Sequence, residues 1–590
     1  MLTHDMLMSV MRPARYIDHE WNVIKKDFNS SRLRFCLCYP EVYDLGMSHL
    51  GSRILYDLIN AAKGVVCERA FCPWPDLGGV LSKKAIALSS LESQMPLRMF
   101  DVLGFSVTNE LNYSNILSML TLGGIPLRAA ERTQGFPLII GGGNCMLNPE
   151  PLADFFDCFV IGEAEEAIME IIAVCLKFRR RYVESSEGKE ALLSALGRIP
   201  GVYVPSFFAV RYEADGSVKE MAALKNGVSV PVKKVWIKDL DKNIYPKSWV
   251  VPHVKIVHDR IGVEIMRGCK HRCRFCQARG HFFPLRIRSA KKIIEMTKAL
   301  YKTSGYEDVS LLSLSSSDHP EIEHIVTSLV SYFQDKGVSV SFPSMRAKKH
   351  FAPLAHSLSS LRKTGLTFAP EAGTERLRKV INKNIVIDDL FEVAQSAFRA
   401  GYRRIKLYFM IGLPTEEERD VEAIVELAHS LSLLRKKVCN RSATINISIA
   451  TFIPKPHTPF QWAAMARPQD IIRKQQQVRE LLRKKRGNMD VTFHNPSMSL
   501  LEAALSRGDR RLSQVIADAF CAGAQFDQWS EWFNFEIWQN AFRKSGLELS
   551  DYAVRSFGLE QTLAWDFIDV GIPKHYLKEE FQKALTADAI

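Results

Sequence analysis

The sequence predicts an α/β protein with an N-terminal doubly wound parallel sheet, a partial (β/α)6 barrel and a helix-rich C-terminal segment. Two series of short apolar segments alternate with amphipathic helical patterns, an arrangement typical of parallel sheets with crossover helices. After about Met489 the alternation gives way to helical patterns and clustered aromatic residues. A chain of 590 residues that is 47% hydrophobic and 24% charged can bury the cores of several domains.

The first series predicts a Rossmann-type domain over residues 1–180. Its strands are expected at residues 34–39, 65–70, 101–107, 137–140 and 157–161, and its helices at 48–60, at 112–122 and from about 164 to 177. Ligands bind such sheets at the carboxyl ends of the strands, near the topological switch point. The loop Gly141-Gly142-Gly143 leaves room for a large ligand next to the backbone, because glycine has no Cβ.

The second series predicts the barrel over residues 259–488. A connecting subdomain (181–258) precedes it, with a charged stretch at 184–189 and β-like pieces at 201–209 and 228–237. The barrel strands are expected at 263–267, 309–314, 338–343, 366–370, 404–411 and 445–452, with helices at 290–301, 386–400 and 419–434. A C-terminal domain (489–590) is expected to pack as a core of its own or to cover the barrel opening.

Three cysteines in one short loop are the strongest chemical signal. Cys269, Cys273 and Cys276 have the spacing C-x3-C-x2-C and follow a predicted strand, where barrel active sites are built. Thiolates select iron–sulfur clusters, zinc or copper(I). A structural zinc site needs a fourth protein ligand, which His271 or His281 would have to supply. A [4Fe–4S] cluster held by three thiolates instead keeps one iron open for a substrate.

This loop, with Phe275 before its last cysteine, resembles that of the radical S-adenosylmethionine superfamily. The resemblance implies that the open iron is chelated by the amino and carboxylate groups of S-adenosylmethionine, which is cleaved to methionine and a 5′-deoxyadenosyl radical. It also implies that residues at the barrel strand ends bind S-adenosylmethionine. Those residues are Phe275, Ser315, Ser316, Asp318, Glu371, Arg376 and Gly412.

The first domain is similar to the cobalamin-binding domain that precedes the barrel in one branch of this superfamily. The residues implied to bind cobalamin lie in the strand-end loops: Asp44, Gly46, Ser106, Thr108, Asn109, Gly141, Gly142, Gly143, Gly162 and Glu163. One departure concerns cobalt. Many cobalamin domains carry D-x-H-x-x-G, but no histidine stands two residues after Asp44, and His49 falls on the following helix. A bound cobalt is therefore expected to lack a histidine ligand on its lower face.

The leading functional hypothesis is cobalamin-dependent methylation of an unactivated carbon by radical chemistry. One alternative is a radical rearrangement or an RNA modification without bound cobalamin. An alternative from another class is a non-catalytic, zinc-stabilised RNA-binding protein. The enzyme predicts iron and sulfide, with a donor such as flavodoxin or ferredoxin supplying electrons, whereas the binding protein predicts zinc.

Composition sets further limits. The formal charge of +13 and pI near 9.1 permit a polyanionic substrate such as RNA, although the substrate itself is unknown. The chain has no apolar run of membrane-spanning length, and its first fifteen residues lack the apolar core of a signal peptide. We therefore expect a cytoplasmic protein without membrane partners, whose twelve cysteines are reduced.

Overall fold

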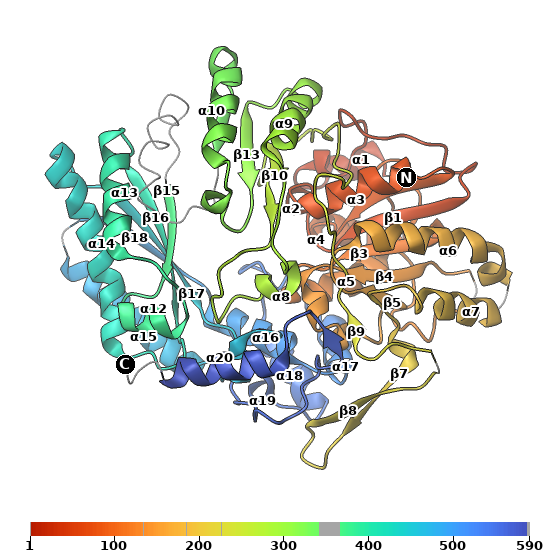
Figure 1. The fold of residues 1–590 in the computed structure, drawn as a ribbon. Helices are drawn as coiled ribbons and strands as arrows, with labels where there is room; N and C mark the ends of the chain where they lie inside the picture. The colour runs from red at the N-terminus through yellow and green to blue at the C-terminus, as the bar shows by residue number, and fades with distance from the viewer. Residues whose placement is uncertain are drawn as a thin grey trace. The chain divides into compact units, whose positions relative to one another are not determined.

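The chain separates into two units in the computed structural model (Figure 1), which describes residues 2–133, 135–184, 186–225, 227–341, 366–485 and 487–586. Unit 1 comprises Met1–Asp259, Ala504–Tyr552 and Glu560–Gly571. Unit 2 comprises Arg260–Ala503, Ala553–Leu559 and Ile572–Ile590. The segment predicted as a C-terminal domain therefore contributes residues to both units. No helix in the described ranges is long and apolar enough to cross a membrane.

Unit 1 is built on a six-stranded sheet in the order β2-β1-β3-β4-β5-β6. The strands are β1 (Leu33–Tyr39), β2 (Val65–Phe71), β3 (Val102–Ser106), β4 (Leu138–Gly142), β5 (Cys158–Val160) and β6 (Val202–Tyr203). The first five are parallel and lie where the sequence predicts them. Strand β6 is antiparallel to β5 and comes from the predicted connecting subdomain. The Tyr203 ring stacks on Phe159 across this pair.

Helices surround this sheet, and one of them corrects a prediction. They are α1 (His4–Met8), α2 (Tyr43–Gly46), α3 (Leu50–Ala61), α4 (Pro75–Lys83), α5 (Tyr113–Leu122), α6 (Ala164–Glu184), α7 (Ser186–Leu196), α17 (Leu512–Cys521) and α18 (Phe535–Lys544). In the charged stretch at 184–189, predicted as the start of a linker, Glu184 ends α6 and residues 186–189 form the first turn of α7. A helix is favoured over an extended linker at this position because α7 buries the apolar side chains of Leu192 and Leu196.

Smaller elements complete unit 1 and its boundary. The connecting region adds the hairpin β7 (Phe208–Tyr212) and β8 (Val218–Ala223), and β9 (Val232–Lys233) pairs with β19 (Ile568–Asp569). Two further helices, α16 (Pro496–Arg507) and α19 (Leu549–Ala553), include residues of both units.

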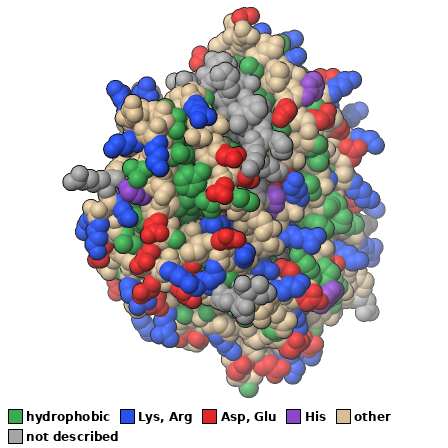
Figure 2. Space-filling view, turned by 60° about the vertical axis from the view of Figure 1, so that its left-hand side comes forward, with side chains coloured by type: hydrophobic (Ala, Val, Ile, Leu, Met, Phe, Trp, Pro, Cys, Tyr) green, Lys and Arg blue, Asp and Glu red, His purple; other side chains and the backbone are tan. Residues whose placement is uncertain are grey.

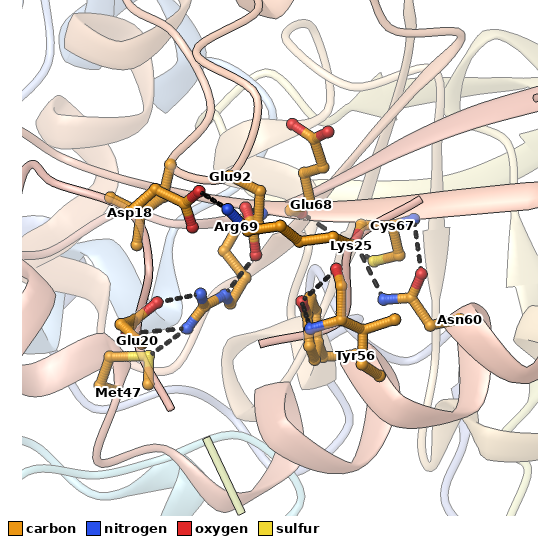
Figure 3. A network of polar contacts seen from close by, with 12 residues as sticks. Asp18, Glu20, Lys25, Met47, Tyr56, Asn60, Cys67, Glu68, Arg69 and Glu92 are labelled. Atoms are coloured by element: carbon orange, nitrogen blue, oxygen red, sulfur yellow. Dashed lines mark hydrogen bonds and ion pairs between the residues drawn. The ribbon is translucent and has the colours of Figure 1, made fainter. Parts of the chain in front are cut away.

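A buried charge network ties the N-terminal segment of unit 1 to β2 (Figure 3). Arg69 lies between two carboxylates: its Nε donates to Glu92 at 2.7 Å, and its other guanidinium nitrogens pair with Glu20. All three side chains are less than 10% exposed. Removing one partner of such a network leaves an uncompensated buried charge, which costs about 3–5 kcal/mol.

The C-terminal part of unit 1 packs against Glu41, the second residue after β1. The indole Nε1–H of Trp529 donates to both Glu41 carboxylate oxygens at 3.2 Å. Burial raises the pKa of Glu41 to about 7 from an ordinary value of 4.5. The folded protein therefore holds this proton more tightly than the unfolded chain, and the free energy of unfolding falls as the pH rises from about 4.5 to about 7.

We expect Glu41→Gln to flatten this pH dependence, because the amide keeps an oxygen for Trp529 and cannot ionise. The shift is worth about 3 kcal/mol at most. Thermal unfolding at pH 5 and pH 8 checks it: the difference in Tm should be smaller in the variant than in the native protein. Equal differences in the two proteins would show that Glu41 does not carry the effect.

Unit 2 contains two parallel sheets among the described residues. One has the order β10 (Ile261–Glu264), β13 (Asp308–Leu312) and β14 (Ser339–Ser341). The other has the order β15 (Leu366–Glu371), β16 (Arg404–Ile411), β17 (Thr444–Thr451) and β18 (Asn488–Phe493). A short antiparallel pair, β11 (Met266–Arg267) and β12 (Arg286–Ile287), follows β10.

The predicted α/β class is confirmed, and the six predicted barrel strands appear in order. Strand β18 is an addition in a region predicted to be helix-rich: residues 488–493 alternate exposed and half-buried positions as an edge strand does. The predicted strand at 338–343 lies partly outside the described residues. In the described ranges no pairing joins β14 to β15, so closure into a barrel remains a prediction.

Helices cover the second sheet on one face, where Ile405, Leu407 and Phe409 of β16 are buried. The helices of unit 2 are α8 (Ala278–Phe282), α9 (Ala290–Ser304), α10 (Ile322–Phe333), α12 (Glu375–Val380), α13 (Ile387–Arg399), α14 (Glu418–Cys439), α15 (Pro468–Lys484) and α20 (Lys574–Thr586). The alternate residues of β15 and β16 face the other way, and Thr367 and Tyr408 line the cavity described below. This face positions the site.

Candidate functional site

The three-cysteine loop begins directly after β11, where Gly268 makes the turn possible. Gly268 has a φ of +94°, and a Cβ there would lie 2.7 Å from the carbonyl oxygen of Phe282. Only glycine tolerates both conditions. The loop then presents Cys269, Cys273 and Cys276, all half-buried, along one wall of a cavity.

This cavity has a volume of about 450 Å³ and lies within unit 2. The loop residues and the ends of β13 and β15 form much of its wall. The lining residues are Cys269, His271, Cys273, Phe275, Cys276, Leu314, Ser315, Thr367, Phe368, Ala369, Pro370, Glu371, Lys383, Ile385, Leu390 and Tyr408. Three of the predicted S-adenosylmethionine residues, Phe275, Ser315 and Glu371, therefore share a cavity with all three cysteines.

All three thiols lie on the wall of this cavity. Among the described residues, no group of three or more His, Cys, Asp or Glu side chains surrounds a point that a single metal ion could occupy. Burial, and secondarily Cys273, raises the pKa of the Cys276 thiol to about 11. Cys276 is therefore protonated at neutral pH in the metal-free chain, and metal binding must displace its proton.

Polar side chains after β13 lie next to the cysteine loop, and one of them, Ser315, lines the cavity. Asp318 accepts hydrogen bonds from His271 Nε2 and Ser315 Oγ, both at 2.6 Å, and Lys270 Nζ lies 3.1 Å from its other oxygen. Asp318 is thus held beside the cysteine loop without lining the cavity. Ser316 is fully buried, and its hydroxyl donates to the carbonyl of Leu311, which stabilises the turn after β13.

An ion pair faces the cysteines from the end of β15. Lys383 Nζ lies 3.2 Å from Glu371 Oε1, and both side chains are about one-sixth exposed. Burial raises the pKa of Glu371, and Lys383 opposes that rise. Glu371 has a φ of +70° at a register shift between β15 and β16, a strained conformation for a residue with a side chain. Glu371 lines the cavity at this point.

Like Ser316 and Asp318, the predicted S-adenosylmethionine residues Arg376 and Gly412 do not line the described wall of this cavity. Arg376 pairs with Asp420 and donates to the carbonyl of Thr415. Gly412 donates its N–H to both oxygens of Glu416 at 3.0 Å, and a Cβ there would lie 2.7 Å from Ile471. In this structure the guanidinium and the glycine backbone are occupied by protein groups; their part in S-adenosylmethionine binding remains a prediction.

In unit 1 the sheet order β2-β1-β3-β4-β5 places a topological switch point between β1 and β3. Polar side chains gather at the carboxyl ends of these strands. Ser52 Oγ donates to Ser106 Oγ at 3.3 Å, and Thr108 shares a 3.1 Å hydrogen bond with Tyr39. Gly142 lies opposite Ser106 in the sheet, and a Cβ on it would meet none of the described atoms within 4 Å. This edge is open at Gly142.

The other predicted cobalamin residues contact their own unit. A Cβ at Gly46, Gly141, Gly143 or Gly162 would lie 2.1–2.5 Å from Phe71, Phe159, Val107 or Val235 respectively. Asp44 pairs with Arg12 and Arg15, Asn109 caps the turn before α5, and Glu163 accepts the N–H of Ile237. His49 caps α3 through its Nδ1, and burial lowers its pKa to about 4.

Among the cavity residues that the sequence did not predict for S-adenosylmethionine or cluster binding are Lys383, Tyr408 and His271. Lys383 follows α12 in a loop without a motif, and Tyr408 occupies a middle position of β16. His271 was considered only as a zinc ligand, but it binds Asp318 from within the cysteine loop. The alternation of β16 signals that Tyr408 shares a face with Lys406, whereas nothing local signals the position of Lys383.

Figure 2 shows positive and negative side chains interspersed over the face it draws, so the net charge of +13 is not concentrated in one patch there. The face drawn in Figure 2 therefore shows no basic patch of the kind that an RNA-binding surface would need.

Comparisons with known proteins address the family. Residues 51–205 match the family described as radical SAM proteins, N-terminal, and residues 263–428 match the radical SAM superfamily. An uncharacterized protein of Methanocaldococcus jannaschii is 28% identical over 485 residues, which cover 81% of this chain and 90% of that protein.

Two solved structures are also similar. The radical S-adenosylmethionine methyltransferase TsrM of Kitasatospora setae, with cobalamin and a [4Fe–4S] cluster bound, is 13% identical with a TM-score of 0.45, covering 71% of this chain and 75% of that one. The cobalamin-dependent S-adenosylmethionine radical enzyme OxsB is 10% identical with a TM-score of 0.46, covering 94% and 79%. The family matches fall on both units and agree with the motif, so the chain belongs to the radical S-adenosylmethionine superfamily.

Proposed function

We propose that this radical S-adenosylmethionine enzyme methylates an unactivated carbon of its substrate with the help of cobalamin. The observation that carries the proposal is the shared cavity of unit 2, where three half-buried cysteines face the Glu371–Lys383 pair. We further propose that a flavodoxin or a ferredoxin delivers the electron. The zinc-stabilised binding protein has no support from the family assignment.

The donor set of the cavity fits a [4Fe–4S] cluster with one open iron. Three thiols line the wall, and the described wall contains no fourth cysteine. When bound, the cluster supplies one electron to the sulfonium of S-adenosylmethionine, which yields methionine and a 5′-deoxyadenosyl radical. Cys269, Cys273 and Cys276 would hold the cluster after losing their thiol protons.

The Glu371–Lys383 pair fits the methionine part of S-adenosylmethionine. That part carries an amino and a carboxylate group, and the cavity offers a carboxylate and an ammonium group 3.2 Å apart. Glu371 would accept hydrogen bonds from the amino group, and Lys383 would donate to the carboxylate. The apolar side chains of Phe275, Leu390 and Tyr408 line the same cavity and would limit water near the radical.

Cobalamin fits unit 1 at the switch point between β1 and β3. Ser106 and Thr108 offer hydroxyl groups there, and Gly142 borders open space. These three residues would hold the cofactor, which supplies the methyl group when bound. Other predicted cobalamin residues, such as Asp44 and Gly162, instead contact protein groups of unit 1.

Gly142→Val tests the switch point. The backbone of Gly142 is not in the left-handed region and its Cβ position is open, so we expect the variant to fold with an unchanged Tm while a branched side chain blocks the ligand. Hydroxocobalamin binding, followed by absorption titration, should weaken by about tenfold or more, equivalent to about 1.4 kcal/mol. Binding equal to the native protein would remove cobalamin from this edge.

The reaction is tested after anaerobic reconstitution with iron, sulfide and, in parallel samples, hydroxocobalamin. The proposed methyltransferase forms both S-adenosylhomocysteine and 5′-deoxyadenosine, because it uses S-adenosylmethionine both as the methyl donor and as the source of the radical. Production of 5′-deoxyadenosine alone, with no effect of cobalamin, would replace methylation by another radical reaction. Failure to form either product would contradict the radical site.

A further inference from the structure

The C-terminal helix α20 contacts the three-cysteine loop through arginines that lie between or beside the cysteines. Both elements belong to unit 2. Arg272, Arg274 and Arg279 of the loop region each lie against α20, through either Tyr576 or Glu580. The loop is therefore held from outside the cavity by a segment about 300 residues away in the sequence.

Arg274 is the central contact and stands between Cys273 and Phe275. Its side chain is 9% exposed, and its Nε donates to Glu580 Oε2 at 3.1 Å. Its Nη1 donates to the carbonyls of Lys379 and Val380, at 3.1 and 2.7 Å, in the last turn of α12. A cation at the carboxyl end of a helix satisfies carbonyls that lack intrahelical partners. Arg274 thus joins α12, the loop and α20.

The backbone of the loop is fixed to the end of α12 as well. The N–H of Arg274 donates to the carbonyl of Ile381 at 3.0 Å, and Asn382 donates to the carbonyl of Arg272 at 2.9 Å. These bonds hold the loop on one side. On the other side, Tyr576 accepts a hydrogen bond from Arg279 at 3.2 Å, and its ring lies 5.2 Å from the Arg279 guanidinium carbon.

Helix α20 is itself anchored in the core of unit 2. Phe581 contacts the rings of Phe460 and Trp462, and Ala584 is fully buried in a cluster that includes Leu377 and Val380 of α12. Glu580 lies in the same turn as Phe581. The Glu580 carboxylate therefore projects from a helix that is packed into the core of unit 2. Lys583 Nζ, 3.2 Å away, is a second cation beside this carboxylate.

We propose that α20 positions the cysteine loop for cluster binding, with Glu580 acting as a positioning residue through Arg274. This inference rests on the proposed function, since it concerns the same cluster. Without the Glu580 carboxylate, the buried Arg274 guanidinium loses the one anionic partner that the described residues give it. The loop that carries Cys273 is then held to α20 only through the Tyr576 contacts of Arg272 and Arg279, among the described contacts. Groups that orient cluster ligands typically change metal affinity by about 10–100-fold when they are removed.

The test uses the full chain with Glu580→Gln, Glu580→Asp and the matched control Glu579→Gln, which alters an exposed carboxylate one residue earlier on the same helix. The first measurement is hydrogen exchange of the loop, residues 268–277, in metal-free protein. The second is the iron and sulfide bound per chain across a reconstitution series. The third is the reduction potential of the cluster with S-adenosylmethionine present.

We expect Glu580→Gln to speed exchange of the loop and to weaken cluster uptake about tenfold. It should also raise the reduction potential, because a positive charge near the cluster is no longer balanced. Glu580→Asp should restore part of each effect, and Glu579→Gln should match the native protein. Exchange and uptake equal to native in Glu580→Gln would overturn the proposal.

A variant that does not fold would move the test to Tyr576→Phe, which loses only the hydrogen bond from Arg279 and should speed loop exchange by a smaller factor. Unchanged exchange in that variant would then overturn the proposal. If the native chain takes up no cluster, the proposed function fails, while loop exchange in the metal-free protein still decides whether α20 holds the loop.

Discussion

A Cys273→Ala variant is expected to lose all cleavage of S-adenosylmethionine. Cys273 is the middle cysteine of the loop in sequence, and it lines the cavity together with Cys269 and Cys276. Two thiolates cannot hold a cubane that needs three, and alanine has no atom that replaces the sulfur. The measurement is 5′-deoxyadenosine formed by the anaerobically reconstituted protein with excess reductant, together with the iron content of the same sample.

The matched control is Cys439→Ala. Cys439 ends α14 with an exposed side chain outside the cavity, so this variant should keep native iron content and product formation. Full cleavage by Cys273→Ala would rule out the three-cysteine loop as the site. Equal losses in both variants would indicate general sensitivity of the protein to cysteine replacement.

A Lys383→Met variant is expected to bind S-adenosylmethionine much more weakly. Methionine keeps the length of the side chain and removes the charge that faces Glu371 and, in the proposed complex, the substrate carboxylate. Truncating one partner of a buried hydrogen-bonded charge pair costs about 2–5 kcal/mol. The dissociation constant should therefore rise by about 30-fold or more.

Lys383 also opposes the rise in the Glu371 pKa that burial causes. Without the ammonium group, Glu371 should take up a proton more readily, so the binding defect should be larger at low pH than at high pH. Lys383→Arg is the control that keeps the charge and should restore most of the affinity. Equilibrium dialysis of labelled S-adenosylmethionine against the reconstituted proteins provides the measurement, and native affinity in Lys383→Met would exclude this residue from the binding site.

Local patterns predicted most elements of the fold because strand and helix periodicity is written in neighbouring residues. The strand predicted at 404–411 has the same bounds as β16, Arg404–Ile411, since it alternates one buried apolar face with one polar face. Strand β6 falls in the β-like piece predicted at 201–209, but its pairing with β5 was not predicted. Strand β18 was missed because it is an edge strand whose polar face resembles a loop.

The loop of Cys269, Cys273 and Cys276 was evident from the sequence alone, because all its ligands come from eight consecutive residues and their chemistry requires no partner elsewhere. Glu371 and Ser315 were also predictable, since Glu371 ends β15, Ser315 closely follows β13, and the ends of parallel strands converge. For the same reason Arg376 and Gly412 looked suitable, but the sequence does not reveal that Asp420 and Glu416 already occupy them.

The amino-acid sequence by itself determined the superfamily, the α/β class and the cysteine ligands, because each depends on residues close together in the chain. Tertiary structure alone decided which distant groups meet. It placed Lys383 against Glu371, His271 against Asp318 and Glu580 against Arg274. Pairs of that kind depend on how separate segments pack, and packing balances burial against desolvation over the whole unit, so no local pattern encodes it.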